Sequence, residues 1–165
     1  MKMGFEPDRR IRKEYKNRRV TATVGGQTCS FRSLFEWRWT QYLQILKDSA
    51  QIATWTYEPT TFYFYGVKSA PHKYTPDFYI KMYALDKVPN YWQECKGHHD
   101  GPTNSKLRRM AEHYPDEIME LVLQGFSKKT AQRRDTAARY TRRIIDGNEI
   151  LRQVRGLIQW EPIDF

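Results

Sequence analysis

The stretch Trp92-Gln93-Glu94-Cys95-Lys96-Gly97 has the pattern of a short strand that ends at a glycine, and Tyr74-Thr75-Pro76-Asp77-Phe78 begins another strand upstream. Side chains alternate between the two faces of an extended strand, so Glu94 and Lys96 point the same way, about 6–7 Å apart. If the strand that begins near Asp77 pairs beside this one, two carboxylates and one ammonium group converge. Such a cluster could bring together a divalent metal, a phosphate and an attacking water.

The composition indicates a single globular domain. The chain has 165 residues, of which 39% are hydrophobic, which is enough for one domain with a core. Aromatic residues make up 15% and suit either the edge of a core or a base-stacking surface. No apolar run reaches the length of a membrane span, and the first residues lack the apolar stretch of a signal peptide, so we expect a soluble, cytoplasmic protein. Cys29 and Cys95 are far apart, which argues against a disulfide framework or a zinc site, and we expect Cys95 to pack behind its strand.

The net charge of +9 is concentrated in two flanking segments. Residues 1–19 hold eight Lys and Arg against three acidic residues, and residues 127–143 hold seven against one. Basic flanks around a nearly neutral centre are typical of a protein that binds a polyanion, although basic runs can also be solvated faces or tails. We interpret 1–19 as a basic arm that could order only on its ligand, and 20–165 as one domain with a core at about 30–124 and a basic helical extension at about 127–160.

Periodicity and capping signals predict a mixed α/β domain. A helix capped by Ser30 or Ser33 should run to about Ser49, and polar loops should occupy 66–73 and 98–104. A strand, a helix and a strand after the antiparallel meander predict a parallel crossover. The C-terminal helices could also form a helix-turn-helix within 127–158. The expected strands are 20–24, 52–57, 61–65, 74–83, 91–96 and 117–123, and the further helices are 105–114, 127–145 and a shorter one with buried positions between 150 and 158.

Glu36 is unusual because it projects from the edge of the apolar stripe of the first helix. It lies three residues before Trp39 and seven before Leu43. A charged group at that edge is costly to desolvate unless it is paired or binds a cation. The alternative is a rim residue paired with a nearby arginine.

A helix with Glu36 at its inner edge is followed by an antiparallel meander, the stretch around Asp77, the stretch around Glu94 and Lys96, a helix and a strand. This order of segments resembles the PD-(D/E)xK, restriction-endonuclease-like nucleases, and among them the bacteriophage endonuclease I type of Holliday-junction resolvase. The resemblance covers about 31–123 and implies a DNA endonuclease that acts on branched or distorted DNA as a homodimer, in a bacterial or phage-infected host cell. Two features depart from the family: Glu94 follows Asp77 by 17 positions, which makes a longer hairpin, and the C-terminal basic helices have no counterpart. The segments that carry the resemblance are Phe31-Arg32-Ser33-Leu34-Phe35-Glu36, Tyr57-Glu58, the two stretches quoted first, and 105–122.

The resemblance implies that Glu36, Asp77, Glu94 and Lys96 form the catalytic set, with one or two Mg²⁺ or Mn²⁺ ions. Asp77, Glu94 and the backbone carbonyl of Cys95 would bind the first ion, and Glu36 would share a second with Asp77. We expect Lys96 to orient water or stabilise charge on the phosphate, because neighbouring carboxylates oppose the low pKa that a lysine base requires.

Several basic side chains are candidates for contacts with the DNA backbone, which give affinity without reading sequence. The adjacent His98 and His99 have no partner spacing that supports zinc. Alternative functions are a nuclease of the same fold in transposon-end cleavage, repair or restriction, a non-catalytic nucleic-acid-binding module, and an RNA-processing or RNA-binding protein. The candidate DNA contacts are Arg32, Lys73, His98, Arg108, Arg109, Lys128, Lys129, Arg133 and Arg134.

Overall fold

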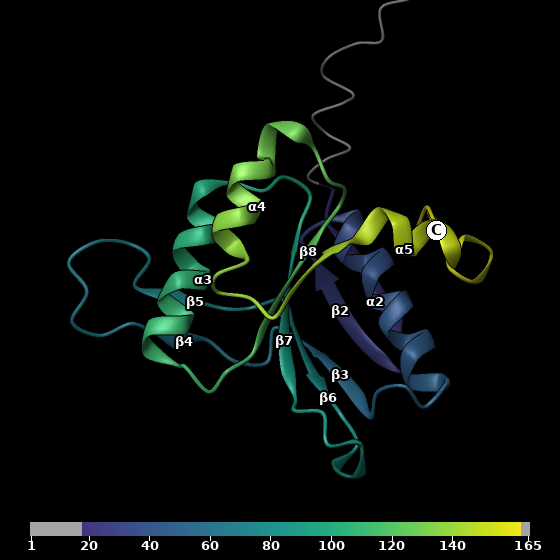
Figure 1. Ribbon diagram of the computed structural model, residues 1–165. Coiled ribbons are helices and arrows are strands. Elements are labelled where there is room, and N and C mark those ends of the chain that lie inside the picture. The colour runs from purple at the N-terminus through teal and green to yellow at the C-terminus, as the bar shows by residue number, and fades with distance from the viewer. Residues whose placement is uncertain (1–17, 163–165) are drawn as a thin grey trace, which may run out of the picture.

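The computed structural model describes residues 18–162 and is an α/β protein built on a five-stranded mixed sheet (Figure 1). The basic arm expected at 1–19 lies almost wholly outside the described residues. The strand order is β3-β6-β7-β8-β9; β6 is antiparallel to β3 and β7, whereas β7, β8 and β9 are mutually parallel neighbours. The strands of this sheet are β3 Thr54–Tyr57, β6 Phe78–Lys81, β7 Tyr91–Lys96, β8 Met119–Leu123 and β9 Arg143–Asp146.

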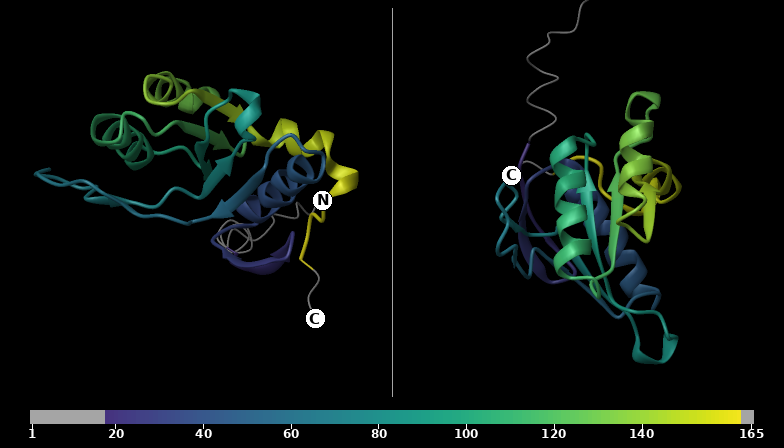
Figure 2. Two further views of the ribbon diagram at one scale, coloured as in Figure 1. Left: turned by 90° about the horizontal axis from the view of Figure 1, so that it is seen from below. Right: turned by 60° about the vertical axis from the view of Figure 1, so that its left-hand side comes forward.

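Helices cover both faces of the sheet and create two cores (Figures 1 and 2). Helices α2 (Leu34–Asp48) and α5 (Gly147–Gln153) lie on one face, and α3 (Gly101–His113) and α4 (Ala131–Ala137) lie on the other. Strand side chains alternate between these layers, so Phe78 and Ile80 pack toward α2 while Tyr79 packs toward α3. All five residues of β8 are buried, as expected for a central strand with parallel neighbours.

A hairpin and a capped helix form the N-terminal part. Strands β1 (Val20–Val24) and β2 (Gln27–Phe31) are joined by Gly25 and Gly26, whose φ angles of 56° and 79° are those of a tight hairpin turn. The expected strand at 20–24 is confirmed, whereas β2 was not predicted. Helix α2 begins at Ser33, whose side chain accepts a hydrogen bond from the Glu36 N–H at 3.2 Å, which confirms one of the two predicted caps.

The prediction of one strand over 74–83 is wrong. Strand β5 (Lys73–Tyr74) pairs with β4 (Phe62–Tyr63) in a separate two-stranded ribbon, and β6 begins only at Phe78. Pro76 lies between β5 and β6, and its missing N–H cannot contribute to a ladder. The strand expected at 61–65 is likewise shortened to β4, and a 3-10 turn, η1 (Ala84–Asp86), lies between β6 and β7.

The predicted helix over 127–145 is also wrong. The 3-10 turn η2 (Lys128–Thr130) and α4 account for its first part, and β9 replaces its end. Ile144 packs into the core beside α3 and Ile145 into the core beside α2, which is the period-two alternation of a strand. Because β9 separates α4 from α5, no helix-turn-helix forms, and the basic extension supplies the edge strand of the sheet.

Smaller differences concern where helices begin and end. The loop expected at 98–104 ends early, because Asp100 accepts a hydrogen bond from the Thr103 N–H at 2.9 Å and caps α3. Asp146 does not terminate a helix but caps α5, which the turn η3 (Arg155–Leu157) follows. Among residues 18–162, no helix combines the length and apolar character needed to cross a membrane.

Candidate active site

The strand register aligns three carboxylates at one end of the sheet. Tyr57 pairs with Phe78, and Phe78 pairs with Gln93. One residue further along each strand brings Glu58, Asp77 and Glu94 into a row; the Glu58 N–H donates to the Asp77 carbonyl at 2.8 Å. The predicted convergence of Asp77 and Glu94 therefore follows from the register.

Glu94 and Lys96 form a salt bridge along β7, with 2.8 Å between Lys96 Nζ and Glu94 Oε1. The second oxygen of Glu94 accepts a hydrogen bond from the Tyr74 hydroxyl at 2.8 Å. Burial disfavours the charged ammonium, but Glu94 and then Asp77 outweigh this effect, so the pKa of Lys96 is raised. Lys96 therefore stays protonated, which suits charge stabilisation and not base catalysis.

Cys95 lies between these two residues and faces the opposite side. Its side chain is buried in the core beside α2, as predicted, and both cysteines are free thiols. Its backbone N–H donates to Asp77 Oδ2 at 2.7 Å. The Asp77 carboxylate is thus fastened to the backbone of β7.

Asp77 is almost completely buried, with 1% of the residue exposed. Its second oxygen accepts from the Arg32 guanidinium at 2.5 Å. Burial raises the pKa of Asp77 well above its usual range, and the neighbouring Glu94 and Glu36 raise it further, while Arg32 and the Cys95 N–H oppose them. The ionised form of Asp77 is therefore held at a cost in free energy.

Glu36 reaches the same region from the first turn of α2. Its Oε2 accepts from the Tyr57 hydroxyl at 2.8 Å and from the Arg32 backbone N–H at 3.0 Å, and its Oε1 accepts from Ser33 Oγ at 3.1 Å. The N-terminal end of a helix also stabilises a carboxylate. Glu36 is buried, with 7% of the residue exposed, and the Arg32 guanidinium pairs with Asp77 and Glu58, so a rim residue paired with Arg32 does not describe Glu36.

Arg32 and Glu58 belong to the site in ways that sequence reasoning missed. The Arg32 guanidinium lies between two carboxylates, 2.5 Å from Asp77 and 2.7 Å from Glu58, although we expected it to contact the DNA backbone. Asp77 and Glu58 raise its pKa against the effect of burial. Glu58 has a φ of 45°, a left-handed conformation that is uncommon for a side chain of this type. The position of Glu58 directly after a strand and before Pro59 was the available signal.

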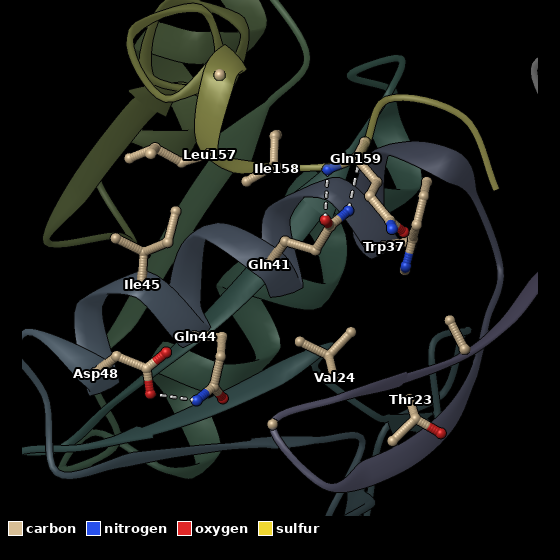
Figure 3. A pocket seen from close by; sticks show the side chains of 13 residues that line it. Thr23, Val24, Trp37, Gln41, Gln44, Ile45, Asp48, Leu157, Ile158 and Gln159 are labelled. Atoms are coloured by element: carbon tan, nitrogen blue, oxygen red, sulfur yellow. Dashed lines mark hydrogen bonds between the residues drawn. The ribbon is translucent and has the colours of Figure 1, made fainter. Parts of the chain in front are cut away.

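A cavity of about 480 Å³, with polar and apolar walls in similar proportion, opens beside these residues, where β7 ends next to the start of α2. Its lining includes Glu36, Cys95, Lys96 and His98. A second hollow, of about 560 Å³, lies between β1, α2 and the segment 156–159 (Figure 3). Its one acidic side chain, Asp48, accepts from Gln44 at 2.7 Å. The first cavity, which adjoins the carboxylate–lysine cluster, is the candidate active site.

The carboxylates buried beside the first cavity have the chemistry of ligands for a hard cation. Within residues 18–162, no three His, Cys, Asp or Glu side chains are placed to hold one metal ion together. A site made of Asp77, Glu94 and the Cys95 carbonyl requires only two carboxylates. Glu36, Asp77 and Glu94 are buried, Arg32 pairs with Asp77 and Lys96 pairs with Glu94, and oxygen ligands are those that Mg²⁺ and Mn²⁺ prefer.

Some of the predicted DNA contacts bind other groups of the protein, and others are exposed. Arg133 donates to the His99 carbonyl at 3.0 Å, and Arg134 donates to the Ser127 carbonyl at 2.7 Å, so both hold loops in place. Arg108 and Arg109 are ion-paired with Glu112 at 3.7 Å and 3.3 Å. The predicted contacts that are exposed and carry no such structural role are Lys73, His98, Lys128 and Lys129.

Comparisons with protein-family models, curated proteins and solved structures find no match for this chain. The chemistry available to the site therefore comes from its residues. Buried carboxylates can bind a divalent cation, and Lys96 supplies a permanent positive charge beside them. Positive charge next to the cavity suits a substrate that develops negative charge, such as a phosphodiester.

Proposed function

We propose that this protein is a metal-dependent DNA endonuclease with a restriction-endonuclease-like core of the PD-(D/E)xK type. The observation that carries the proposal is the cluster of Asp77, Glu94 and Lys96, in which Lys96 lines the cavity and the two carboxylates are buried behind it. Asp77 and Glu94 stand across adjacent strands, as this chemistry requires, and Glu36 approaches them from a helix N-terminus. Residues 20–162 act as one nuclease domain, because the basic extension supplies β9.

The roles of the residues follow from their charges. Asp77, Glu94 and the Cys95 carbonyl would hold Mg²⁺ or Mn²⁺, and Glu36 would contribute to a second ion. The metal supplies a Lewis acid and an activated water when it is bound. Lys96 stabilises negative charge on the phosphate and orients the attacking water. Arg32, between Asp77 and Glu58, limits repulsion among the carboxylates before substrate and metal arrive.

The charge distribution supports a nucleic acid as the substrate. The chain carries a net charge of +9, and Lys128 and Lys129 are exposed in η2. Contacts from such residues to phosphates depend on the shape of the DNA backbone and not on the base sequence. We therefore propose selection of branched or distorted DNA, including Holliday junctions, by a homodimer that cuts both strands.

The test is a cleavage assay on a four-way junction, a linear duplex, a single strand and a supercoiled plasmid, with Mg²⁺, Mn²⁺ or EDTA. Metal-dependent paired nicks in the junction are expected. Asp77→Asn should abolish cleavage while the protein still binds junction DNA, and Asp116→Asn, at an exposed turn, is the matched control that should cut normally.

Each outcome of this assay has a defined meaning. Cleavage confined to a specific duplex sequence or to single strands would assign the same site to restriction, repair or transposon-end cleavage. Undiminished cutting by Asp77→Asn would exclude the proposed site. Binding without metal-dependent cleavage of any substrate would favour a nucleic-acid-binding module, although such a module has no need for buried carboxylates beside its ligand.

A further inference from the structure

The ribbon formed by β4 and β5 projects from the domain on the side of α3 (Figures 1 and 2). It belongs to the segment 58–77 that links β3 to β6, and its connecting loop extends well beyond the helices. The ribbon is tied to the site directly, because Tyr74 of β5 donates its hydroxyl to Glu94.

Aromatic residues alternate along the first arm of the ribbon. Phe62 and Phe64 are buried, and Phe62 contacts the rings of Trp92 and Tyr114 with centroid distances of 5.1 Å and 4.8 Å. The Tyr114 hydroxyl also donates to the Tyr63 carbonyl at 2.8 Å. The inner face therefore anchors the ribbon to the domain through a rigid aromatic cluster.

The outer face has a different character. Tyr63 is 49% exposed and Tyr65 is 80% exposed, and their rings stack with centroids 6.4 Å apart and planes inclined by 24°. Lys73 is the direct cross-strand partner of Tyr63, so its exposed side chain emerges on the same face. Two aromatic rings with similar orientation and a cation are thus exposed to solvent on the same face of the ribbon.

The charge of the segment indicates what this face would bind. The acidic residues of the segment 58–77 are those at its two ends, Glu58 and Asp77, which pair with Arg32, whereas residues 59–76 contain Lys68, His72 and Lys73. Isolated exposed tyrosines are common on protein surfaces, but a stacked pair bordered by positive charge matches the chemistry of bases joined by phosphates. Fully paired DNA keeps its bases stacked inside the duplex, so the rings would be accessible only to unpaired bases.

We propose that Tyr63, Tyr65 and Lys73 form a stacking platform for unpaired nucleotides of DNA, next to the bond that is cut. This inference deepens the proposed endonuclease function and rests on it for the location of the cut. One or two unstacked bases pack on the tyrosine rings, and Lys73 contacts an adjacent phosphate. The platform would make DNA with unpaired bases a better ligand than continuous duplex.

Binding measurements in EDTA test the platform without any cleavage. The probes are a short oligo-dT and a duplex with two unpaired 2-aminopurine bases, compared with a fully paired duplex. Tyr65→Ala and Tyr63→Ala should each weaken binding of the unpaired probes about tenfold, since base–aromatic stacking contributes about 1–3 kcal/mol per base. Binding of paired duplex should change less than about twofold, within the effect of an ordinary surface substitution. Stacking should also quench 2-aminopurine fluorescence in the wild type and not in the alanine variants.

Two further variants separate stacking from general damage. Tyr65→Phe keeps the ring and should retain wild-type affinity and quenching. Tyr83→Ala removes another exposed tyrosine, in the β6–β7 connection, and should change nothing. The platform would be overturned if the Tyr63/Tyr65 double alanine variant bound the unpaired probes as tightly as the wild type. It would also be overturned if the variants lost the same affinity for paired DNA as for unpaired DNA. Because these experiments contain no metal, they can succeed or fail independently of the cleavage assay.

Discussion

Asp77→Asn should make the protein more stable in the absence of metal while removing its response to metal. Asp77 is 1% exposed and shares its surroundings with Glu94 and Glu36. Asparagine resembles the protonated form of this side chain and still offers an oxygen to the Cys95 N–H. The substitution therefore removes one of three neighbouring buried carboxylates and so reduces the repulsion between them.

The pH dependence gives the sign of the effect. In the unfolded chain Asp77 loses its proton near pH 3.9, whereas the native protein keeps the proton to higher pH because the pKa is raised. Between these two pKa values the native state binds more protons, so the free energy of unfolding falls as pH rises. Above the native pKa, the free energy of unfolding is lowered by the full cost of ionising the buried Asp77. The Asp77→Asn variant cannot ionise at this position, so its stability should not fall with pH for this reason.

The magnitude follows from the linkage between pKa and stability. Each unit by which the native pKa exceeds the unfolded value costs about 1.4 kcal/mol, and the weakened contact with Arg32 offsets part of the gain. We expect a net stabilisation of about 1–2 kcal/mol at pH 8 in EDTA. For a chain of this length that raises Tm by about 2–8 °C.

Urea and thermal unfolding, with EDTA and with Mg²⁺ or Mn²⁺, provide the assay. At a metal concentration of about 100 times Kd, the wild type should gain about 2.7 kcal/mol, whereas Asp77→Asn should gain little, so the order of stability reverses. Asp116→Asn serves as the control and should follow the wild type in both conditions. A variant that is less stable than wild type in EDTA, or that gains equally from metal, would refute the reasoning.

Three other substitutions probe features outside the proposed metal ligands, and each is measured by the free energy of unfolding in urea. Ser33→Ala removes the cap of α2 and a hydrogen bond to Glu36, so a loss of about 1 kcal/mol is expected; an unchanged value would mean that another group caps the helix. Trp55→Ala empties a fully buried position in β3 and should cost about 3–5 kcal/mol, and a loss below about 1 kcal/mol would contradict the packing described for that core. Glu120→Ala leaves Arg142 and Gln93 without their buried partner and should cost about 2 kcal/mol, whereas Glu120→Gln should retain part of that stability; equal losses would show that charge is not important there.

The parts of the fold that could be predicted depend on local signals. Ser33 caps its helix through a contact three residues away, and the face shared by Glu94 and Lys96 follows from strand geometry alone. The pairing of Asp77 with β7 could also be anticipated, because the two strands are successive in the meander.

The parts that were missed depend on partners distant in the chain. Residues 143–146 are helical by local pattern, yet they pair with β8, where Ile144 and Ile145 reach different cores. Arg32 was expected to contact DNA because it is basic, but the register of β3 and β6 places Glu58 and Asp77 within reach of its guanidinium. Neither the edge strand nor the salt bridge has a signature within a short window of sequence.

The placement of β9 limits how this molecule can adapt to its substrate. β9 follows α4 and its neighbouring basic turn, and it is hydrogen-bonded into the sheet that carries the carboxylates. Lys128 and Lys129 therefore lie in a short segment whose two ends are attached to neighbouring strands of that sheet, not on a free tail. If the protein binds DNA as proposed, the DNA would have to match the spacing between these lysines and the carboxylates, and flexible sequences or discontinuities in the helix would deform to that spacing at the lowest cost.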